Sequence, residues 1–121
     1  MTMVTTRPET RPVETVTPMK LSEAIRLGSL TTRPIKGFYF EVADGVFISR
    51  LGFGETPIGA CAWGAAAFAM GLNPEDLNAL YDDVGTERRI YLRDHITSWN
   101  DDPHNPLTRE QIADRIEQMG Y

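Results

Sequence analysis

The chain has 121 residues, of which 41% are hydrophobic and 24% charged, with 12 basic and 17 acidic side chains. This length suits one domain and the hydrophobic share suits one modest core, so global disorder is excluded. No apolar run approaches the roughly 20 residues that cross a bilayer, and no signal peptide is recognised. The single cysteine excludes a disulfide framework and a multi-cysteine zinc site. The net charge of −5 argues against a general nucleic-acid binder, which carries a basic surface.

Residues 1–18 differ in composition from the rest of the chain. They contain six threonines, three prolines and no aromatic residue, too little apolar surface to offset the entropy of ordering. Their two arginines and two glutamates cancel, so residues 19–121 carry the whole charge of −5. We therefore predict an extended Thr/Pro-rich arm over 1–18 and a single domain over 19–121. The arm is expected to order on a partner by backbone pairing and packing, with contacts at Thr5, Thr6, Val13 and Val16.

The domain opens with a predicted short helix over 23–27. Ser22 is the expected N-terminal cap and Gly28 the expected stop. The apolar stripe of this helix is expected to consist of Leu21, Ala24 and Ile25.

A β-hairpin is predicted next. Two runs rich in aromatic and β-branched residues, 38–42 and 46–49, flank the turn sequence Ala43-Asp44-Gly45. Phe38, Phe40 and Val42 alternate along the first strand, so they are expected to share one face. A lone hairpin is marginal in water, and this one must therefore pack on helices.

The stretch from Cys61 to Met70 is apolar on all sides, which predicts a helix buried at the centre of the domain. Gly71 is its expected C-terminal cap. The run from Asn73 to Asp76 then combines a capping side chain, a proline and two acids, which predicts a new helix. That helix is expected to bury Leu77 and Leu80 and to end near Gly85.

Two further helices complete the prediction. The first runs from Thr86 to about Trp99, with Leu92, Ile96 and Trp99 at helical spacing. The second begins at Thr108, where a capping box with Gln111 is expected. Its apolar face consists of Ile112, Ala113, Ile116 and Met119. The predicted fold class is α+β: a small, mainly helical domain of about five helices with one β-hairpin.

Cys61 is the first candidate for chemistry, because it follows a glycine-containing loop and opens a helix. Backbone N–H groups and the helix dipole lower a thiol pKa at such a place. His95 or His104 would supply the base, oriented by Asn100, Asp101 or Asp102. Cysteine is also among the most buried residue types, and a structural role in the alanine-rich helix is the reading we favour.

The loop Asn100-Asp101-Asp102-Pro103-His104 is the second candidate. Its carboxylates, carboxamide and imidazole suit a divalent cation, with Asn100, Asp101 and His104 as the central ligands. Further ligands would have to come from Glu41, Asp94 or His95. The alternative, which we favour, is a polar loop between helices whose side chains satisfy free backbone groups.

Two other sets of residues are interpreted structurally. Trp63 and Trp99 are expected in the core rather than stacked on a ligand. Arg88, Arg89 and Arg93 are expected to form salt bridges on a solvated surface.

Three segments carry a resemblance. They are the opening Met19–Gly28, the Cys-Ala-x-Gly-Ala-Ala run of Cys61–Ala66, and Asn100–Asp114, where an Asn-Asp-x-x-His loop leads to Thr-Arg-Glu-Gln-Ile-Ala-Asp. By these segments residues 19–121 resemble a family of small uncharacterised proteins of bacteriophages and bacterial genomes. The resemblance implies a phage or prophage setting and no established activity. Some relatives carry a Cys-x-x-Cys insertion that this chain lacks, so a metal role tied to it does not transfer.

Three hypotheses about function follow. We favour a non-enzymatic phage-type accessory protein that acts by protein–protein contact, as a virion or assembly component whose arm orders on a partner. The alternatives are a Cys61/His-dependent hydrolase or transferase and a small-ligand or metal-binding module, for which a role against host defence is one hypothesis. We expect no cofactor, a protein partner or a second copy, no nucleic acid and no membrane. The expected location is the host cytoplasm or the virion.

Overall fold

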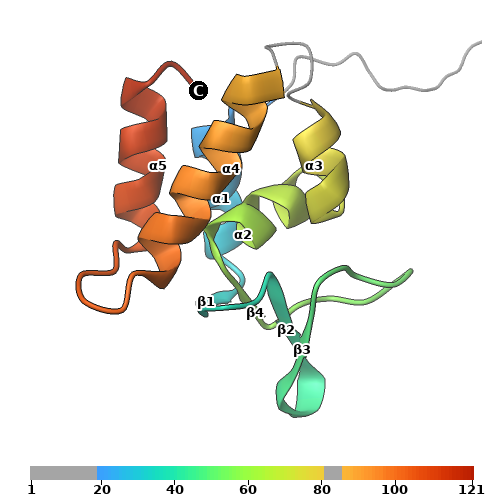
Figure 1. Cartoon of the computed structure of the whole chain (residues 1–121). Helices are drawn as coiled ribbons and strands as arrows, with labels where there is room; N and C mark the ends of the chain where they lie inside the picture. Colours follow the sequence, from blue (N-terminus) through green and yellow to red (C-terminus); the bar gives the residue numbers. More distant parts are fainter. Residues whose placement is uncertain (1–18, 81–85) are drawn as a thin grey trace, which may run out of the picture.

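A computed structural model describes residues 19–80 and 86–121, and the predicted arm of residues 1–18 lies outside them. Within this part, the α-helices are α1 (Leu21–Ser29), α2 (Ala62–Ala69), α3 (Pro74–Leu80), α4 (Thr86–Asp101) and α5 (Arg109–Gln118). The strands are β1 (Arg33–Pro34), β2 (Phe40–Val42), β3 (Val46–Ile48) and β4 (Gly59–Ala60). The mainly helical α+β class is confirmed. The helices gather at one end of the molecule and the strands at the other (Figure 1).

α1 is longer than predicted and begins differently. Lys20 is its N-cap residue, and the Glu23 carboxylate accepts a hydrogen bond from the Lys20 N–H at 3.2 Å. Ser22 lies buried in the first turn, so its predicted role as the cap was wrong. The helix also continues through Gly28 to Ser29. A methyl group at Gly28 would overlap the carbonyl oxygen of Ala65, so this glycine permits close helix packing rather than ending the helix.

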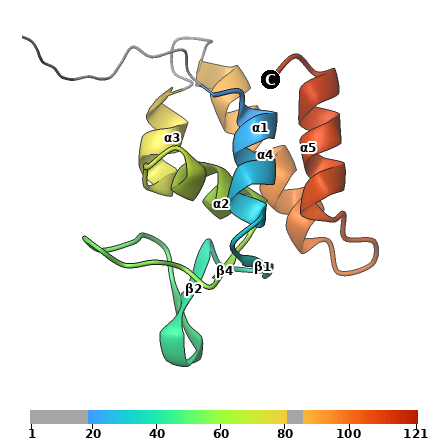
Figure 2. The ribbon, with the colours of Figure 1, turned by 180° about the vertical axis from the view of Figure 1, so that it is seen from behind.

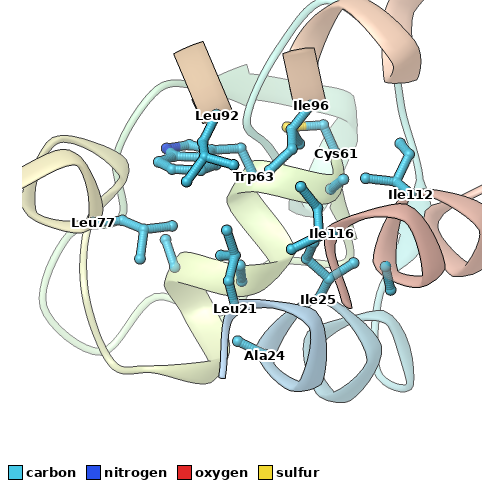
Figure 3. Close-up of a cluster of buried hydrophobic side chains, with 14 residues drawn as sticks. Leu21, Ala24, Ile25, Cys61, Trp63, Leu77, Leu92, Ile96, Ile112 and Ile116 are labelled. Atoms are coloured by element: carbon cyan, nitrogen blue, oxygen red, sulfur yellow. The ribbon is translucent and has the colours of Figure 1, made fainter. Parts of the chain in front are cut away.

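α2 is the central element, as its composition predicts. Every residue from Ala62 to Ala67 is buried. One side of α2 contributes Trp63 to the cluster between the helices, which Figure 3 shows in close-up. The other side contributes Ala65 to a smaller cluster with Phe40 and Ala60 of the sheet. α2 therefore joins the helical core to the sheet (Figures 1 and 2).

The sheet has the order β1-β4-β2-β3, with β1 parallel to β4 and the other neighbours antiparallel. The predicted hairpin is β2–β3, and its turn places Asp44 and Gly45 at positive φ, 67° and 72°. Of the three residues expected to share one face of the first strand, Phe40 and Val42 lie in β2, two positions apart and so on the same side. Only Phe40 is fully buried, while Phe38 precedes β2 and is 53% exposed. The two-residue strands β1 and β4 were not predicted.

α3 begins at Pro74 as predicted, but its expected end near Gly85 lies outside the described residues. Leu80 is 47% exposed, so its predicted burial was wrong. Leu77 is fully buried and fixes the helix on the core.

α5 begins with the predicted capping box. The Thr108 hydroxyl accepts from the Gln111 N–H at 3.1 Å, and the Gln111 side chain accepts from the Thr108 N–H at 2.9 Å. Met119 is 41% exposed, so only Ile112, Ala113 and Ile116 form the buried face. Trp99 of α4 is partly buried rather than enclosed in the core, with the Arg115 guanidinium 5.1 Å from its ring centre.

α1 and α5 are joined on their outer side by Arg26. Its guanidinium donates to Glu110, Asp114 and Glu117 at 2.8, 2.6 and 2.9 Å. These three carboxylates raise the pKa of Arg26. The start of α2 and the end of α4 meet below these helices, where the Ala62 N–H donates to Asn100 Oδ1, and Cys61 and Asp101 lie at this meeting point.

Candidate functional site

Cys61 lies at the N-terminus of α2, as predicted, but as the cap residue rather than the first helical residue. Its Sγ accepts a hydrogen bond from the Gly64 N–H at 3.4 Å, and its own N–H donates to the Tyr39 carbonyl at 3.2 Å. The residue is 4% exposed and borders the helical core beside Ile96 (Figure 3).

Burial raises the pKa of the Cys61 thiol to about 11, and hydrogen bonds from the Gly64 and Trp63 backbone offset only part of that rise. The expectation that the helix N-terminus lowers this pKa was therefore wrong. The free-energy cost of removing the thiolate from water exceeds the stabilisation that the nearby N–H groups provide. At neutral pH the group is a neutral thiol that caps a helix.

Asn100 connects three segments of the chain. It is 5% exposed, its Oδ1 accepts from the Ala62 N–H at 3.1 Å, and its Nδ2 donates to the Ile35 carbonyl at 2.9 Å. The second Nδ2 hydrogen bond goes to Asp101 Oδ1 at 2.8 Å. The amide thus fixes the end of α4 to the start of α2 and to the segment after β1. These hydrogen bonds support the alternative in which the side chains of this loop satisfy backbone groups. They occupy the Asn100 amide, which would otherwise be available to bind a metal ion.

Asp101 and Cys61 line the same hollow, although 40 positions separate them in the sequence. We call this hollow the α4–hairpin cavity. It has a volume of about 320 Å³. Its lining residues are Gly37, Phe38, Tyr39, Ser49, Cys61, Thr97 and Asp101. Asp101 Oδ1 accepts a further hydrogen bond from the Gly37 N–H at 3.1 Å, which holds the segment before β2 against α4.

The two histidines lie elsewhere. His95 stacks on Trp99 with ring centres 5.2 Å apart, and His104 is exposed in the loop after α4. Neither lines the α4–hairpin cavity. The Asp102 carboxylate accepts from the His104 and Asn105 N–H groups, which lowers its pKa. Among residues 19–80 and 86–121 no group of three or more His, Cys, Asp or Glu side chains is placed to hold a metal ion.

Ion pairs involve three of the other residues that the sequence singled out, Glu41, Arg93 and Asp94. Glu41 is buried in β2, where it pairs with Arg33. The Arg93 guanidinium lies 3.6 Å from the Asp94 carboxylate, as expected for a salt bridge on α4. The side chains of Arg88 and Arg89 lie outside the described part, as do Thr5, Thr6, Val13 and Val16 of the predicted arm.

Arg109 is a structural residue that the sequence reasoning missed. Its guanidinium is half-buried and donates to the Ser29, Thr32 and Ala60 carbonyls at 3.3, 2.6 and 3.2 Å, and to the Thr32 hydroxyl at 2.8 Å. Burial lowers its pKa. Arg109 lies in the first turn of an amphipathic helix, and nothing in the neighbouring sequence indicates that its guanidinium will bind a carbonyl group at the end of α1.

An exposed apolar surface on the hairpin was also missed. The rings of Phe38 and Phe47 stack with centres 5.0 Å apart, although the side chains are 53% and 45% exposed. Val46, at the start of β3, is 49% exposed. We call the stacked pair of Phe38 and Phe47 the aromatic face; Val46 precedes Phe47 along β3 and therefore points to the other side of the sheet. The aromatic runs of the hairpin were visible in the sequence, but the exposed contact between Phe38 and Phe47 was not predicted.

Comparison with protein-family models, with curated proteins and with solved structures finds no match to this chain. Within the described residues, no helix combines the length and the apolar character needed to cross a membrane.

Proposed function

We propose that the chain is a non-enzymatic accessory protein that acts by protein–protein contact, of the phage type that its sequence resembles. The single observation that carries this proposal is the aromatic face on the β2–β3 hairpin. Large aromatic side chains are enriched at protein interfaces and depleted on free surfaces. Here a stacked pair lies on a hairpin that projects from the helical body (Figure 2).

The position of β3 supports a contact by strand pairing. β3 is the last strand in the order β1-β4-β2-β3, so among the described strands it has a neighbour on one side only. An edge strand with exposed apolar side chains is a template for another strand. Val46 and Phe47 are about half exposed on this strand. The partner that this edge fits best is a second copy of the chain, because two identical edge strands can pair antiparallel about a two-fold axis.

The arm is the second element of the proposal. Thr5, Thr6, Val13 and Val16 are β-branched residues in a segment of zero net charge. We propose that they contact the neighbouring copy through backbone pairing and packing. Because the arm has no net charge, its contribution should depend little on ionic strength. In a phage setting such an arm would link copies within a virion or an assembly intermediate, in the host cytoplasm or the particle.

The enzyme alternative has less support. A cysteine nucleophile acts as the thiolate and needs a base within hydrogen-bond reach. Cys61 is 4% exposed, its pKa is raised to about 11, and the cavity that it lines contains no histidine among the described residues.

The test is sedimentation velocity over a concentration series. The wild-type chain is expected to form dimers at micromolar to tens of micromolar concentration. Phe47→Thr introduces a β-branched residue that suits a strand and removes the exposed ring, and it should weaken the dimer roughly tenfold. The matched control is Leu30→Ser, which removes an apolar side chain that is 79% exposed after α1 and should leave the dimer unchanged.

Two results would contradict the proposal. One is a wild-type chain that stays monomeric at several hundred micromolar. The other is equal weakening by Phe47→Thr and Leu30→Ser. Deletion of residues 2–18 tests the arm separately: the shortened chain should keep its circular dichroism spectrum and lose part of the dimer affinity at both low and high salt.

A further inference from the structure

We propose that the α4–hairpin cavity is a binding site for a small organic cation, an amine attached to an apolar or aromatic body. This inference is separate from the proposed dimer, because the charge and the acceptors on which it relies lie at Asp101 and Thr97, although Phe38 belongs to both the cavity wall and the aromatic face. The cavity is formed where the segment before β2, the segment after β3 and the C-terminal half of α4 converge on the N-terminus of α2.

The depth and size of the cavity suit a small ligand. Cys61 is 4% exposed and lines the deep end, whereas Phe38 and Asp101 are exposed and lie at the mouth. The volume of about 320 Å³ lies at the lower end of the range for ligand pockets. A ligand with a single ring or a short alkyl chain would therefore fill it.

The negative charge at the mouth of the α4–hairpin cavity favours a cationic ligand. Asp101 is the only charged residue among the described residues that line the cavity. Its Oδ1 receives the Gly37 N–H and the Asn100 amide, and within the described part of the chain no hydrogen bond reaches Oδ2. One carboxylate oxygen thus remains available to a ligand. Two other charged residues of α4, Arg93 and Asp94, form a salt bridge with each other and do not line the cavity.

The hydroxyl of Thr97 adds a second acceptor. Its Oγ1 lies 3.0 Å from the Arg93 carbonyl and 3.3 Å from the Asp94 carbonyl, so its hydrogen is directed back to the helix. Toward the cavity the oxygen can only accept. Asp101 and Thr97 together therefore call for a ligand that donates hydrogen bonds, as an ammonium group does.

The aromatic walls fit the rest of such a ligand. Phe38 and Tyr39 supply two rings, and burial raises the pKa of Tyr39, so its phenol stays neutral. Aromatic rings attract cations through their faces and pack against apolar groups. An anionic ligand would meet the Asp101 carboxylate and, among the lining residues that the structure describes, no balancing cation.

The experiment uses benzylamine and its neutral analogue benzyl alcohol as probes of the full-length chain. Binding is followed by the backbone amide chemical shifts of Gly37, Ser49 and Thr97. Benzylamine should cause saturable shifts at these positions and bind more tightly than benzyl alcohol. Asp101→Asn retains the Oδ1 acceptor for Gly37 and removes the charge, and it should weaken benzylamine roughly fivefold while leaving benzyl alcohol unchanged.

Asp102→Asn is the matched control, since Asp102 is the next residue, does not line the cavity and keeps its acceptor in the variant. It should bind benzylamine as the wild type does. The proposal is overturned if benzylamine gives no saturable shifts at the cavity residues, if benzyl alcohol binds equally well, or if both variants weaken benzylamine alike. Asp101→Asn also separates the two proposals: it should weaken benzylamine binding and leave the dimer unchanged in sedimentation velocity, because Asp101 is not part of the aromatic face.

Discussion

The carboxylate of Glu41 meets the guanidinium of Arg33 across the backbone of Gly59. The two hydrogen bonds measure 2.9 Å and 2.6 Å, and the Glu41 side chain is 4% exposed. Gly59 of β4 pairs with Arg33 on one side and with Glu41 on the other. The absence of a side chain at the central position leaves room for the ion pair. This contact joins three strands whose lengths are only two or three residues.

Gly59→Ala should therefore destabilise the domain. A methyl group at position 59 would come within 2.9 Å of both Glu41 Oε1 and Ile35 Cγ2, so the ion pair or the strand must shift. We expect a loss of about 1–3 kcal/mol in the free energy of unfolding, measured by urea denaturation. Gly52→Ala is the control, because the methyl group there meets only the flexible side chain of Glu55. Equal stability of the two variants would refute this role of Gly59.

The Glu41–Arg33 pair predicts an acid-sensitive stability. The hydrogen bonds from Arg33 lower the pKa of Glu41 below its ordinary value of 4.5. The unfolded chain then binds a proton more readily than the folded one, so this contribution is present above pH 4.5 and lost as the pH falls through the folded pKa. Glu41→Gln should be less stable than the wild type at pH 7, and the difference should shrink below pH 4.5. A difference that is constant from pH 7 to pH 3 would contradict the prediction.

Asn100 should contribute to stability far more than an ordinary loop residue. Asn100→Ala leaves the Ala62 N–H and the Ile35 carbonyl without their partner in a buried place. An orphaned buried group of this kind costs about 1–3 kcal/mol, and we expect a loss in that range by thermal or urea unfolding. Asn105→Ala is the control, since Asn105 is exposed and donates through its backbone. A loss no larger than that of the control would show that Asn100 is not the connecting residue.

Cys61 should make the domain sensitive to alkali. Its pKa rises from 9.0 to about 11 on folding, so the unfolded chain releases the thiol proton first and stability falls as the pH rises from 9 toward 11. The expected loss reaches about 2 kcal/mol at the upper end of this window. Cys61→Ser retains a capping oxygen without the titration, and its stability should fall less over the same window. Parallel pH profiles for the two chains would contradict the assignment.

The same thiol should label slowly in the folded protein. At pH 7 a disulfide reagent should modify Cys61 at least a hundredfold more slowly in the native chain than in urea, because the thiolate fraction and the exposure are both low. Rapid native labelling would restore the hydrolase hypothesis. The measurement is the rate of chromophore release, with free cysteine as the standard.

Local signals in the sequence predicted some elements well. The capping box at Thr108 and Gln111 lies within four consecutive residues, and the apolar run of α2 needs no partner to be recognised. The exact role of Gly28 could not be predicted in the same way, because it depends on Ala65 of another helix. β1 and β4 are two residues long, too short for any periodicity, and they exist because each is a neighbour of the other.

The sequence by itself determined the mainly helical class, the central position of α2, the α5 capping box and the hairpin turn, because these follow from composition and from residues a few positions apart. Only the tertiary structure decided what the chemistry-bearing residues do. It buried Cys61 and raised the pKa of its thiol, used Asn100 as a connector, and brought Asp101 to the same cavity as Cys61. It also brought the rings of Phe38 and Phe47 together on an exposed surface, a contact that the sequence did not predict. Desolvation and long-range hydrogen bonding depend on which distant segments pack together, and a pattern within a few neighbouring residues does not reveal this.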